Sequence, residues 1–136
     1  MGDKIMSLAA APQGSLVALA LESGALKVLD LETGEEVFSQ QFQGGVAALS
    51  WSFDGRYLAA GTDQLIQIWD MERRELVQSI KAANDILALG WGSKGHLLAS
   101  GSYRGILDLW SAESGEHVWV RGDLREHYPV LSQEST

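Results

Sequence analysis

The hydrophobic positions of this chain fall into short runs separated by polar, glycine-containing segments. In the middle of the chain the runs cover residues 46–52, 56–62, 65–70 and 76–81. Each is roughly five to eight residues long and rich in Val, Ile, Leu, Ala and Trp, which is typical of β-strands. Asp54-Gly55, between the first two runs, predicts a tight hairpin, because glycine accepts the positive φ that such turns require. We therefore predict an all-β chain.

The pattern occurs three times at a spacing of about 40 residues. Residues 5–30, 46–70 and 86–111 superimpose column by column when one residue is deleted from the second unit beside Asp63. In the third run of that unit, Ile66 and Ile68 alternate with Leu65 and Trp69, so both faces are apolar. A sheet with two apolar faces is expected to lie between two other sheets. Several matched columns are assigned to structure: Gly14, Gly55, Gly95, Trp51, Trp69, Asp70, Trp91 and Trp110.

The strings SWSFDGRYLAAGT with IQIWD (50–70) and LGWGSKGHLLASGS with LDLWS (89–111) resemble repeats of the WD-repeat β-propeller family. The resemblance implies three four-stranded antiparallel blades, at about residues 5–43, 44–82 and 83–122. These form one domain, 1–122, which is followed by a polar C-terminal tail, 123–136. The resemblance also implies a buried hydrogen-bonded network in each blade, of which two pairs remain here. They are Thr62 with Trp69 and Ser102 with Trp110.

Three blades do not close a ring, because propellers typically have four to eight. Two blade faces would stay exposed, and each would be a larger apolar surface than monomers usually carry. We expect two chains to complete a six-bladed propeller as a two-fold homodimer. In one alternative a different protein supplies the missing blades. In another the chain is a fragment or an engineered half-propeller with self-assembly as its only property, although the opening Met1 and the polar tail favour a complete product.

Composition excludes several functions for these 136 residues. The net charge of −8 opposes binding to nucleic acid and to anionic membranes, so neither is expected as a partner. The sequence has no cysteine, which rules out disulfides and thiolate zinc sites, and His96, His117 and His127 share no ligand spacing. The longest apolar stretch is far shorter than the roughly 18 residues of a membrane-spanning helix. We expect an intracellular, cytoplasmic protein without cofactor or metal.

Catalysis is not expected, because the inner strands carry apolar or small residues and no convergent titratable groups. A propeller enzyme or small-ligand binder that uses the central channel is the alternative from another class. The WD-repeat resemblance instead implies a scaffold that binds proteins or peptides on the rim where the loops before the first strand and between the second and third strands gather. The candidate rim residues are Glu22, Ser23, Asp63, Gln64, Asn84, Asp85, Tyr103 and Arg104.

Overall fold

The computed structural model describes residues 3–12, 14–83, 85–92, 97–102 and 105–121. These residues form twelve β-strands in three antiparallel sheets of four strands each. The first sheet holds β1 (Ile5–Ala10), β2 (Leu16–Leu21), β3 (Ala25–Asp30) and β4 (Glu36–Gln41). The second holds β5 (Ala48–Trp51), β6 (Tyr57–Gly61), β7 (Leu65–Asp70) and β8 (Glu75–Lys81). The third holds β9 (Ile86–Trp91), β10 (Leu97–Ser102), β11 (Ile106–Ser111) and β12 (His117–Arg121).

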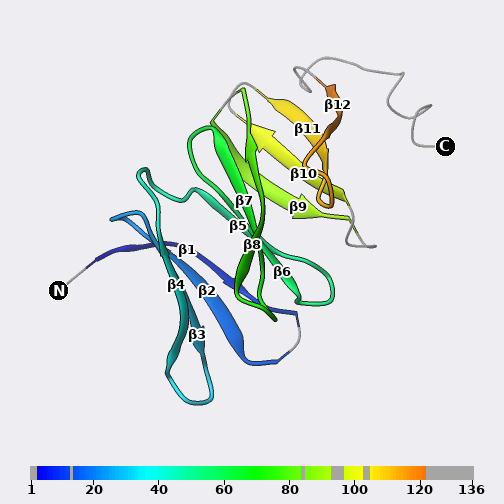
Figure 1. Cartoon of the computed structure of the whole chain (residues 1–136). Helices are drawn as coiled ribbons and strands as arrows, with labels where there is room; N and C mark the ends of the chain where they lie inside the picture. Colours follow the sequence, from blue (N-terminus) through cyan, green and yellow to red (C-terminus); the bar gives the residue numbers. More distant parts are fainter. Residues whose placement is uncertain (1–2, 13, 84, 93–96, 103–104, 122–136) are drawn as a thin grey trace.

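The sheets follow one another in sequence order, with the second between the other two (Figure 1). Each pairs its strands in chain order, and the first strands lie where neighbouring sheets meet, because β5 contacts both β1 and β9. The predicted run 65–70 is β7 itself, whereas β5 is shorter than the predicted run 46–52. Single backbone hydrogen bonds continue its pairing, from Ala47 N to Gly61 O and from Ser52 N to Tyr57 O. The predicted all-β architecture of three four-stranded sheets is therefore confirmed.

The predicted tail, 123–136, lies outside the described residues. So does Gly95, which the sequence places in the same repeat column as Gly14 and Gly55. Among the described glycines of the same column, Gly14 and Gly55 have φ values of 81° and 76°. The loop from β6 to β7 is one residue shorter than its two counterparts. Thr62 N donates to Leu65 O three residues on, whereas Ser102 pairs with Ile106 four residues on. The deletion inferred from the sequence is thus located in this loop.

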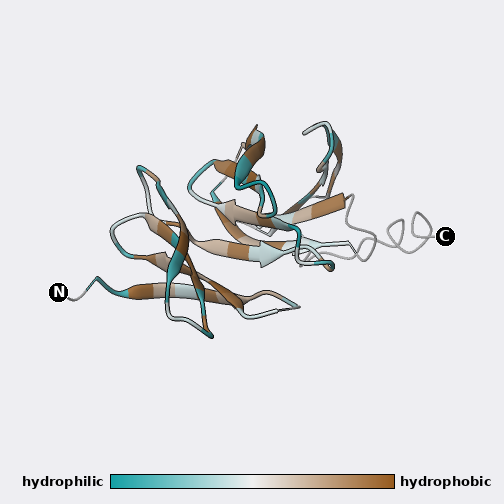
Figure 2. Cartoon of the chain, turned by 60° about the horizontal axis from the view of Figure 1, so that its bottom comes forward, coloured by the Kyte–Doolittle hydropathy of each residue, from teal (hydrophilic) through white to brown (hydrophobic). Residues whose placement is uncertain are grey.

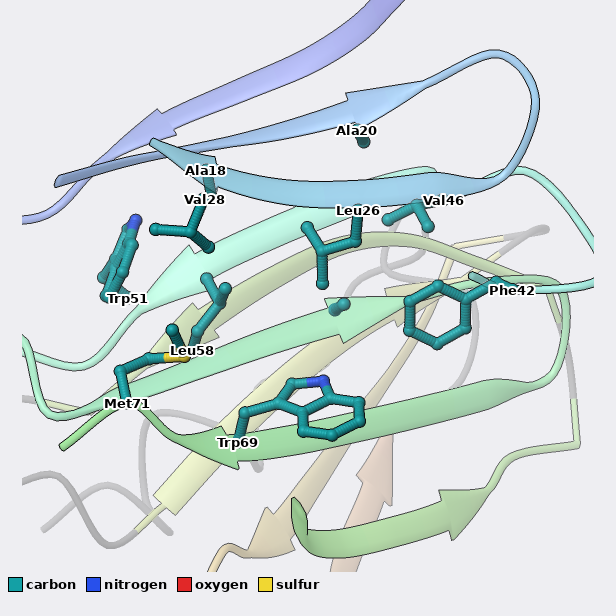
Figure 3. Packing of buried hydrophobic residues seen from close by; sticks show 11 residues of the cluster. Ala18, Ala20, Leu26, Val28, Phe42, Val46, Trp51, Leu58, Trp69 and Met71 are labelled. Carbon is teal, nitrogen blue, oxygen red and sulfur yellow. The ribbon is translucent and has the colours of Figure 1, made fainter. Parts of the chain in front are cut away.

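One hydrophobic core fills the space between the first and second sheets (Figure 3). The first sheet contributes small and medium side chains, and the second contributes larger ones, among them Trp51 and Trp69. The ring of Phe38 meets Trp69 edge to face, with 5.2 Å between centroids. The buried members are Ala18, Ala20, Leu26, Val28, Phe42, Val46, Trp51, Leu58, Ala60, Trp69 and Met71. The second sheet therefore buries its Trp69 side against the first sheet.

A second core lies between the second and third sheets. The opposite face of β7 supplies Ile66 and Ile68, which are 0% and 1% exposed, as the alternation in the sequence predicts. They pack with side chains of the third sheet, including Leu98 and Trp110. Tyr57 and Trp91 stack across the same boundary, with ring centroids 6.1 Å apart. The second sheet is thus covered on both faces.

Hydrogen bonds at matched positions fasten each sheet to the preceding one. Trp51 Nε1 donates to Ala9 O over 2.8 Å, and Trp91 Nε1 donates to Ser50 O over 3.0 Å. Because Ala9 and Ser50 occupy the same column of the repeat, both joints use the same indole-to-carbonyl bond. At the outer end of the first joint, Arg74 Nη1 donates to Val37 O over 2.6 Å. These bonds fix the rotation of each sheet against its neighbour.

The tryptophan hydrogen bonds predicted inside the blades are wrong in both cases. Trp110 Nε1 donates to Ser100 Oγ over 2.9 Å, and not to Ser102, whose hydroxyl donates to the carbonyl of Ile106. Thr62 Oγ1 likewise donates to a backbone carbonyl, and Trp69 Nε1 is buried with no hydrogen-bond partner among the described residues. The register explains the error, because Trp110 pairs with Leu98 and the nearest hydroxyl on that face is two residues along. In the second sheet that position is an alanine.

Candidate functional site

The candidate rim lies at one end of the sheets, where β2 joins β3, β4 joins β5, β6 joins β7 and β8 joins β9 (Figure 1). Of the predicted residues, Glu22, Ser23, Asp63, Gln64 and Asp85 are described, and all are exposed. The predicted residues Asn84, Tyr103 and Arg104 lie outside the described residues. The described part of the rim is therefore that of the first and second sheets with the start of the third.

Two hollows adjoin each other on this rim. The larger, of about 660 Å³, lies between the end of β4 and the loop from β6 to β7, and it is lined by residues of both. The smaller, of about 370 Å³, includes Met6, Glu22, Val46 and Asp63. Asp63 lines both hollows, and Gln64 lines the larger one. Glu22 and Gln64 thus line two different hollows that share Asp63, and residues of the first two sheets contribute to both. The two hollows together are called the depression around Asp63.

Asp63 lies close to Gly44 in this depression. A Cβ built on Gly44 would lie 3.2 Å from Asp63 Oδ2, so a side chain at position 44 would crowd the carboxylate. The backbone amide of Glu22 donates to Lys4 O, but the carboxylates of Glu22 and Asp63 have no hydrogen-bond or ion-pair partner among the described residues. Both are exposed.

Other candidate residues are already engaged within the chain. Ser23 N and Ser23 Oγ both donate to the carboxylate of Asp3, and Gln41 Nε2 donates to Ser23 O over 2.9 Å. Gln64 Nε2 donates to Asp85 Oδ1 over 3.4 Å, which links the second sheet to the strand that opens the third. Ser23 consequently supports the shape of its loop, while Asp85 positions Gln64 at the edge of the larger hollow.

Two aspartates at the opposite end of the sheets accept hydrogen bonds that hold turns together. Asp30 accepts from the Ser15 hydroxyl over 2.7 Å and from the Glu32 amide, and these bonds lower its pKa. Burial raises the pKa of Asp70. Hydrogen bonds from Arg56 and from two backbone amides lower it by more than burial raises it, so the net shift is downward. These two aspartates therefore hold turns together.

Sequence reasoning missed several residues around the larger hollow. Four of them line it: Gln40 near the end of β4, Gln43 just after β4, Gln67 on β7, and Lys81 at the end of β8. The run Gln40-Gln41-Phe42-Gln43 is the only signal that the sequence offered, because it places amides on both sides of a buried aromatic ring. Lys81 is the only basic side chain in the described lining of the two rim hollows.

A second groove, of about 490 Å³, lies between the second and third sheets. His117 Nε2 lies 2.6 Å from Asp108 Oδ1, and the imidazole packs on Trp110 with 4.8 Å between ring centroids. The sequence placed His117 at the start of an outer strand but did not pair it with Asp108. In the part of the chain that the structure describes, no three His, Cys, Asp or Glu side chains gather into a metal-binding group, and no helix is long and apolar enough to cross a membrane.

A family model and several solved structures resemble this chain. The model of the family "Anaphase-promoting complex subunit 4 WD40 domain" matches residues 37–94, which include the whole second sheet. The solved structure "Structure of U3-55K" superimposes with a TM-score of 0.83 at 20% identity, over 90% of this chain and 40% of that one. The structure "Crystal structure of RRP9 WD40 repeats" gives 0.81 at 21% identity, over 88% and 39%. The three sheets therefore have the fold of WD-repeat propeller blades and fit a partial WD-repeat domain.

The WD-repeat resemblance seen in the sequence is thereby confirmed. The chain spans about two fifths of the length of those WD-repeat structures. Hydrazine synthase of Kuenenia stuttgartiensis also superimposes, with a TM-score of 0.77 at 15% identity, over 85% of this chain and 35% of that one. At these identities the structural likenesses show the shared fold of the blades.

Proposed function

We propose that this chain is a non-enzymatic WD-repeat scaffold that binds a protein or peptide through the rim of its first and second blades. The observation that carries the proposal is the depression around Asp63. Side chains from two blades line it, and two of its carboxylates have no partner among the described residues. WD40 domains generally mediate protein interactions, which agrees with this assignment.

The charges of the depression favour a basic ligand. Glu22 and Asp63 are acidic, Lys81 is the one described basic residue of the lining, and the whole chain carries a net charge of −8. Glutamine amides beside them can both donate to and accept from a peptide backbone. We therefore expect an extended segment with Lys or Arg side chains, whose charge would also speed its association.

An array of immobilised twelve-residue peptides, probed with the full chain, tests this function. We expect binding to be enriched in peptides with Lys or Arg and to weaken as salt increases. Asp63→Lys should abolish that enrichment. Glu35→Lys is the matched control, since it makes the same change of charge on an exposed turn at the opposite end of the sheets. If the two variants bind the array alike, the rim is not the docking site.

We further propose that two chains close one six-bladed ring. The support is a contrast between matched columns. Met71 of the second blade is 4% exposed beneath the first blade, whereas its counterpart Leu31 is 66% exposed. On the other free face, Leu107 and Leu109 are only partly buried, while the matched Ile66 and Ile68 are at most 1% exposed.

The described residues form no blade beyond the first or the third, and β1, the strand that follows the N-terminus, carries the exposed hydrophobic side chains Ile5, Met6 and Leu8. Hydrophobic segments are visible along this strand (Figure 2). A ring that covers both faces would combine folding with association. Sedimentation equilibrium should then give twice the mass of one chain. A folded species with the mass of one chain would contradict the ring of two chains. If that species then formed a complex with a different protein, the different protein would be the source of the missing blades.

A cytoplasmic location remains a prediction from the sequence.

A further inference from the structure

Each joint inside the chain places a β-branched side chain of the following blade opposite a small residue of the preceding blade. At the second joint, a Cβ built on Gly61 would lie 2.5 Å from Ile86 Cγ2 and 3.4 Å from Leu89 Cδ1. Only glycine therefore leaves room for the isoleucine. At the first joint the same columns hold Ala20 and Val46, which are both buried in the first core (Figure 3). The smaller residue faces the larger side chain in each case.

On the outward face of the third blade, no isoleucine among the described residues takes the corresponding place. Gly101 stands in the column of Gly61, and among the described residues only Ala88 Cβ, at 3.7 Å, lies near a Cβ built there. The series therefore predicts an isoleucine opposite Gly101, because isoleucine is the side chain that the glycine at the second joint receives.

The first blade carries the matching side chains. Ile5 and Leu8 occupy the columns of Ile86 and Leu89, are the same residue types, and are 59% and 62% exposed. The local backbone agrees as well, because β1 and β9 have a register irregularity at the same point, just after Ile5 and just after Ile86. The first blade thus presents the side chains that the free face of the third blade would accommodate.

We propose that Ile5 and Leu8 of one copy fill the space above Gly101 of a second copy. This contact deepens, and rests on, the proposed ring of two chains, since it names the residues through which the copies meet. It also makes the contact reciprocal in a closed ring, so that the same joint forms twice.

This joint between copies lacks the indole-to-carbonyl hydrogen bond that both internal joints possess. The indole of Trp51 binds Ala9 O, and that of Trp91 binds Ser50 O. Continuing the series, the acceptor at the free end is Gly90 O, while the residue of the first blade in the tryptophan column is Ala10, which has no side-chain donor. The joint between copies is therefore the weakest of the ring and the one at which the ring opens.

Disulfide trapping tests the contact, and the absence of cysteine from the chain makes it specific. A Cβ at position 61 would lie 3.1 Å from Ile86 Cβ, near the roughly 3.5–4.5 Å that disulfides need. Gly61→Cys with Ile86→Cys is thus the control that should form a bond within one chain. Ile5→Cys with Gly101→Cys should form bonds between two chains under oxidised glutathione. Ile5→Cys with Ser79→Cys, an exposed position on β8, should form none.

Each result on a non-reducing gel has a separate meaning. A covalent dimer from the Ile5 and Gly101 pair supports the contact. If the control pair oxidises internally and this pair stays monomeric, the contact is wrong, and sedimentation of the unmodified chain then shows separately whether two copies associate at all. A ladder of longer covalent chains would support the contact while overturning the closed ring, because the same joint would then be repeating without closure.

Adding an indole donor at position 10 tests the alignment of the two copies independently. Ala10→Trp should lower the dissociation constant of the dimer by up to about tenfold at each joint, the value of one added hydrogen bond. Ser79→Trp, which adds the same side chain on the outer strand, should leave the dissociation constant unchanged. A dissociation constant that Ala10→Trp leaves unchanged or raises would overturn the proposed alignment of the two copies.

Discussion

The free energy that one buried indole hydrogen bond contributes can be measured at two matched sites, by removing it in the third blade and by adding it in the second. In the third blade the acceptor is the hydroxyl of Ser100. Ser100 is fully buried and accepts from Trp110 Nε1 over 2.9 Å. Ser100→Ala removes only an oxygen, so the cavity term is small and the main cost is an indole donor left without a partner. Such a buried orphan costs about 1–3 kcal/mol, and we expect the free energy of unfolding to fall by about 2 kcal/mol.

The second blade holds the reverse situation. Ala60 occupies the column of Ser100, and Trp69 Nε1 is buried with no acceptor in the part of the chain that the structure describes. Leu58 pairs with Trp69 as Leu98 pairs with Trp110, so a serine at position 60 would stand where Ser100 stands. Ala60→Ser should therefore raise the free energy of unfolding by about 1 kcal/mol, the net value of a typical hydrogen bond.

Urea unfolding followed by circular dichroism measures both variants. With a denaturant slope of roughly 2 kcal/mol/M, Ser100→Ala should lower the midpoint by about 1 M and Ala60→Ser should raise it by about 0.5 M. All proteins must be compared at one concentration, because association would stabilise the folded state. Ala59→Ser is the matched control. It puts the same hydroxyl on the opposite, fully buried face of β6, where the described tryptophan nitrogens already have acceptors. It should therefore lower the free energy of unfolding.

The reasoning fails if Ser100→Ala is neutral, since the indole would then be satisfied in some other way. It also fails if Ala60→Ser destabilises the protein as much as Ala59→Ser does. In that case the hydroxyl would not reach Trp69, and the columns of the two blades would not be equivalent in space.

Three further outcomes are expected. Gly24→Ala should destabilise by about 2 kcal/mol or more in urea unfolding, because φ is +94° and the new Cβ would lie 2.6 Å from a backbone carbonyl oxygen. Gly61→Ala should destabilise by about 1–3 kcal/mol, because the new Cβ would lie 2.5 Å from Ile86 Cγ2. Ile86→Ala removes that methyl group, so in a double-mutant cycle the two substitutions together should cost less than the sum of their separate effects. The pKa of Asp70 is lowered on folding, so its carboxylate stabilises the fold above its unfolded value of about 4 and loses that contribution as the pH falls below it. In acid titrations of stability, Asp70→Asn should show a shallower decline.

The blade architecture was predictable from the sequence because its signals are local and repeated. Strand length, the hairpin at Gly55 and the two apolar faces of residues 65–70 each follow from a few neighbouring side chains, and three copies reinforce one another. The tryptophan partners were not predictable in this way. The string Ser100-Gly101-Ser102 offers two hydroxyls on one face, and only the register with β11 decides which of them reaches Trp110.

The rim was predictable only in part. Glu22, Asp63 and Gln64 were found because they occupy matched loops, and matched loops of a repeat meet at one end. Gln40 and Lys81 were missed because they line the larger hollow from the ends of outer strands, where the angle between two packed sheets opens a gap. That angle arises from joints such as the Trp51 bond to Ala9 O, which connect residues far apart in the sequence.

The free faces and the rim are connected through the geometry of the blades. Covering Leu31 and its neighbours with a second copy would place two depressions like that around Asp63 on one ring, related by a two-fold axis. A ligand with two basic segments could then bind both, and the second contact would form at a high effective concentration. Because such a ligand bridges the joint between copies, it would also stabilise the joint that lacks an indole bond. Association of the chain and occupancy of its rim should therefore strengthen each other, as linkage requires of two equilibria that share one assembled state.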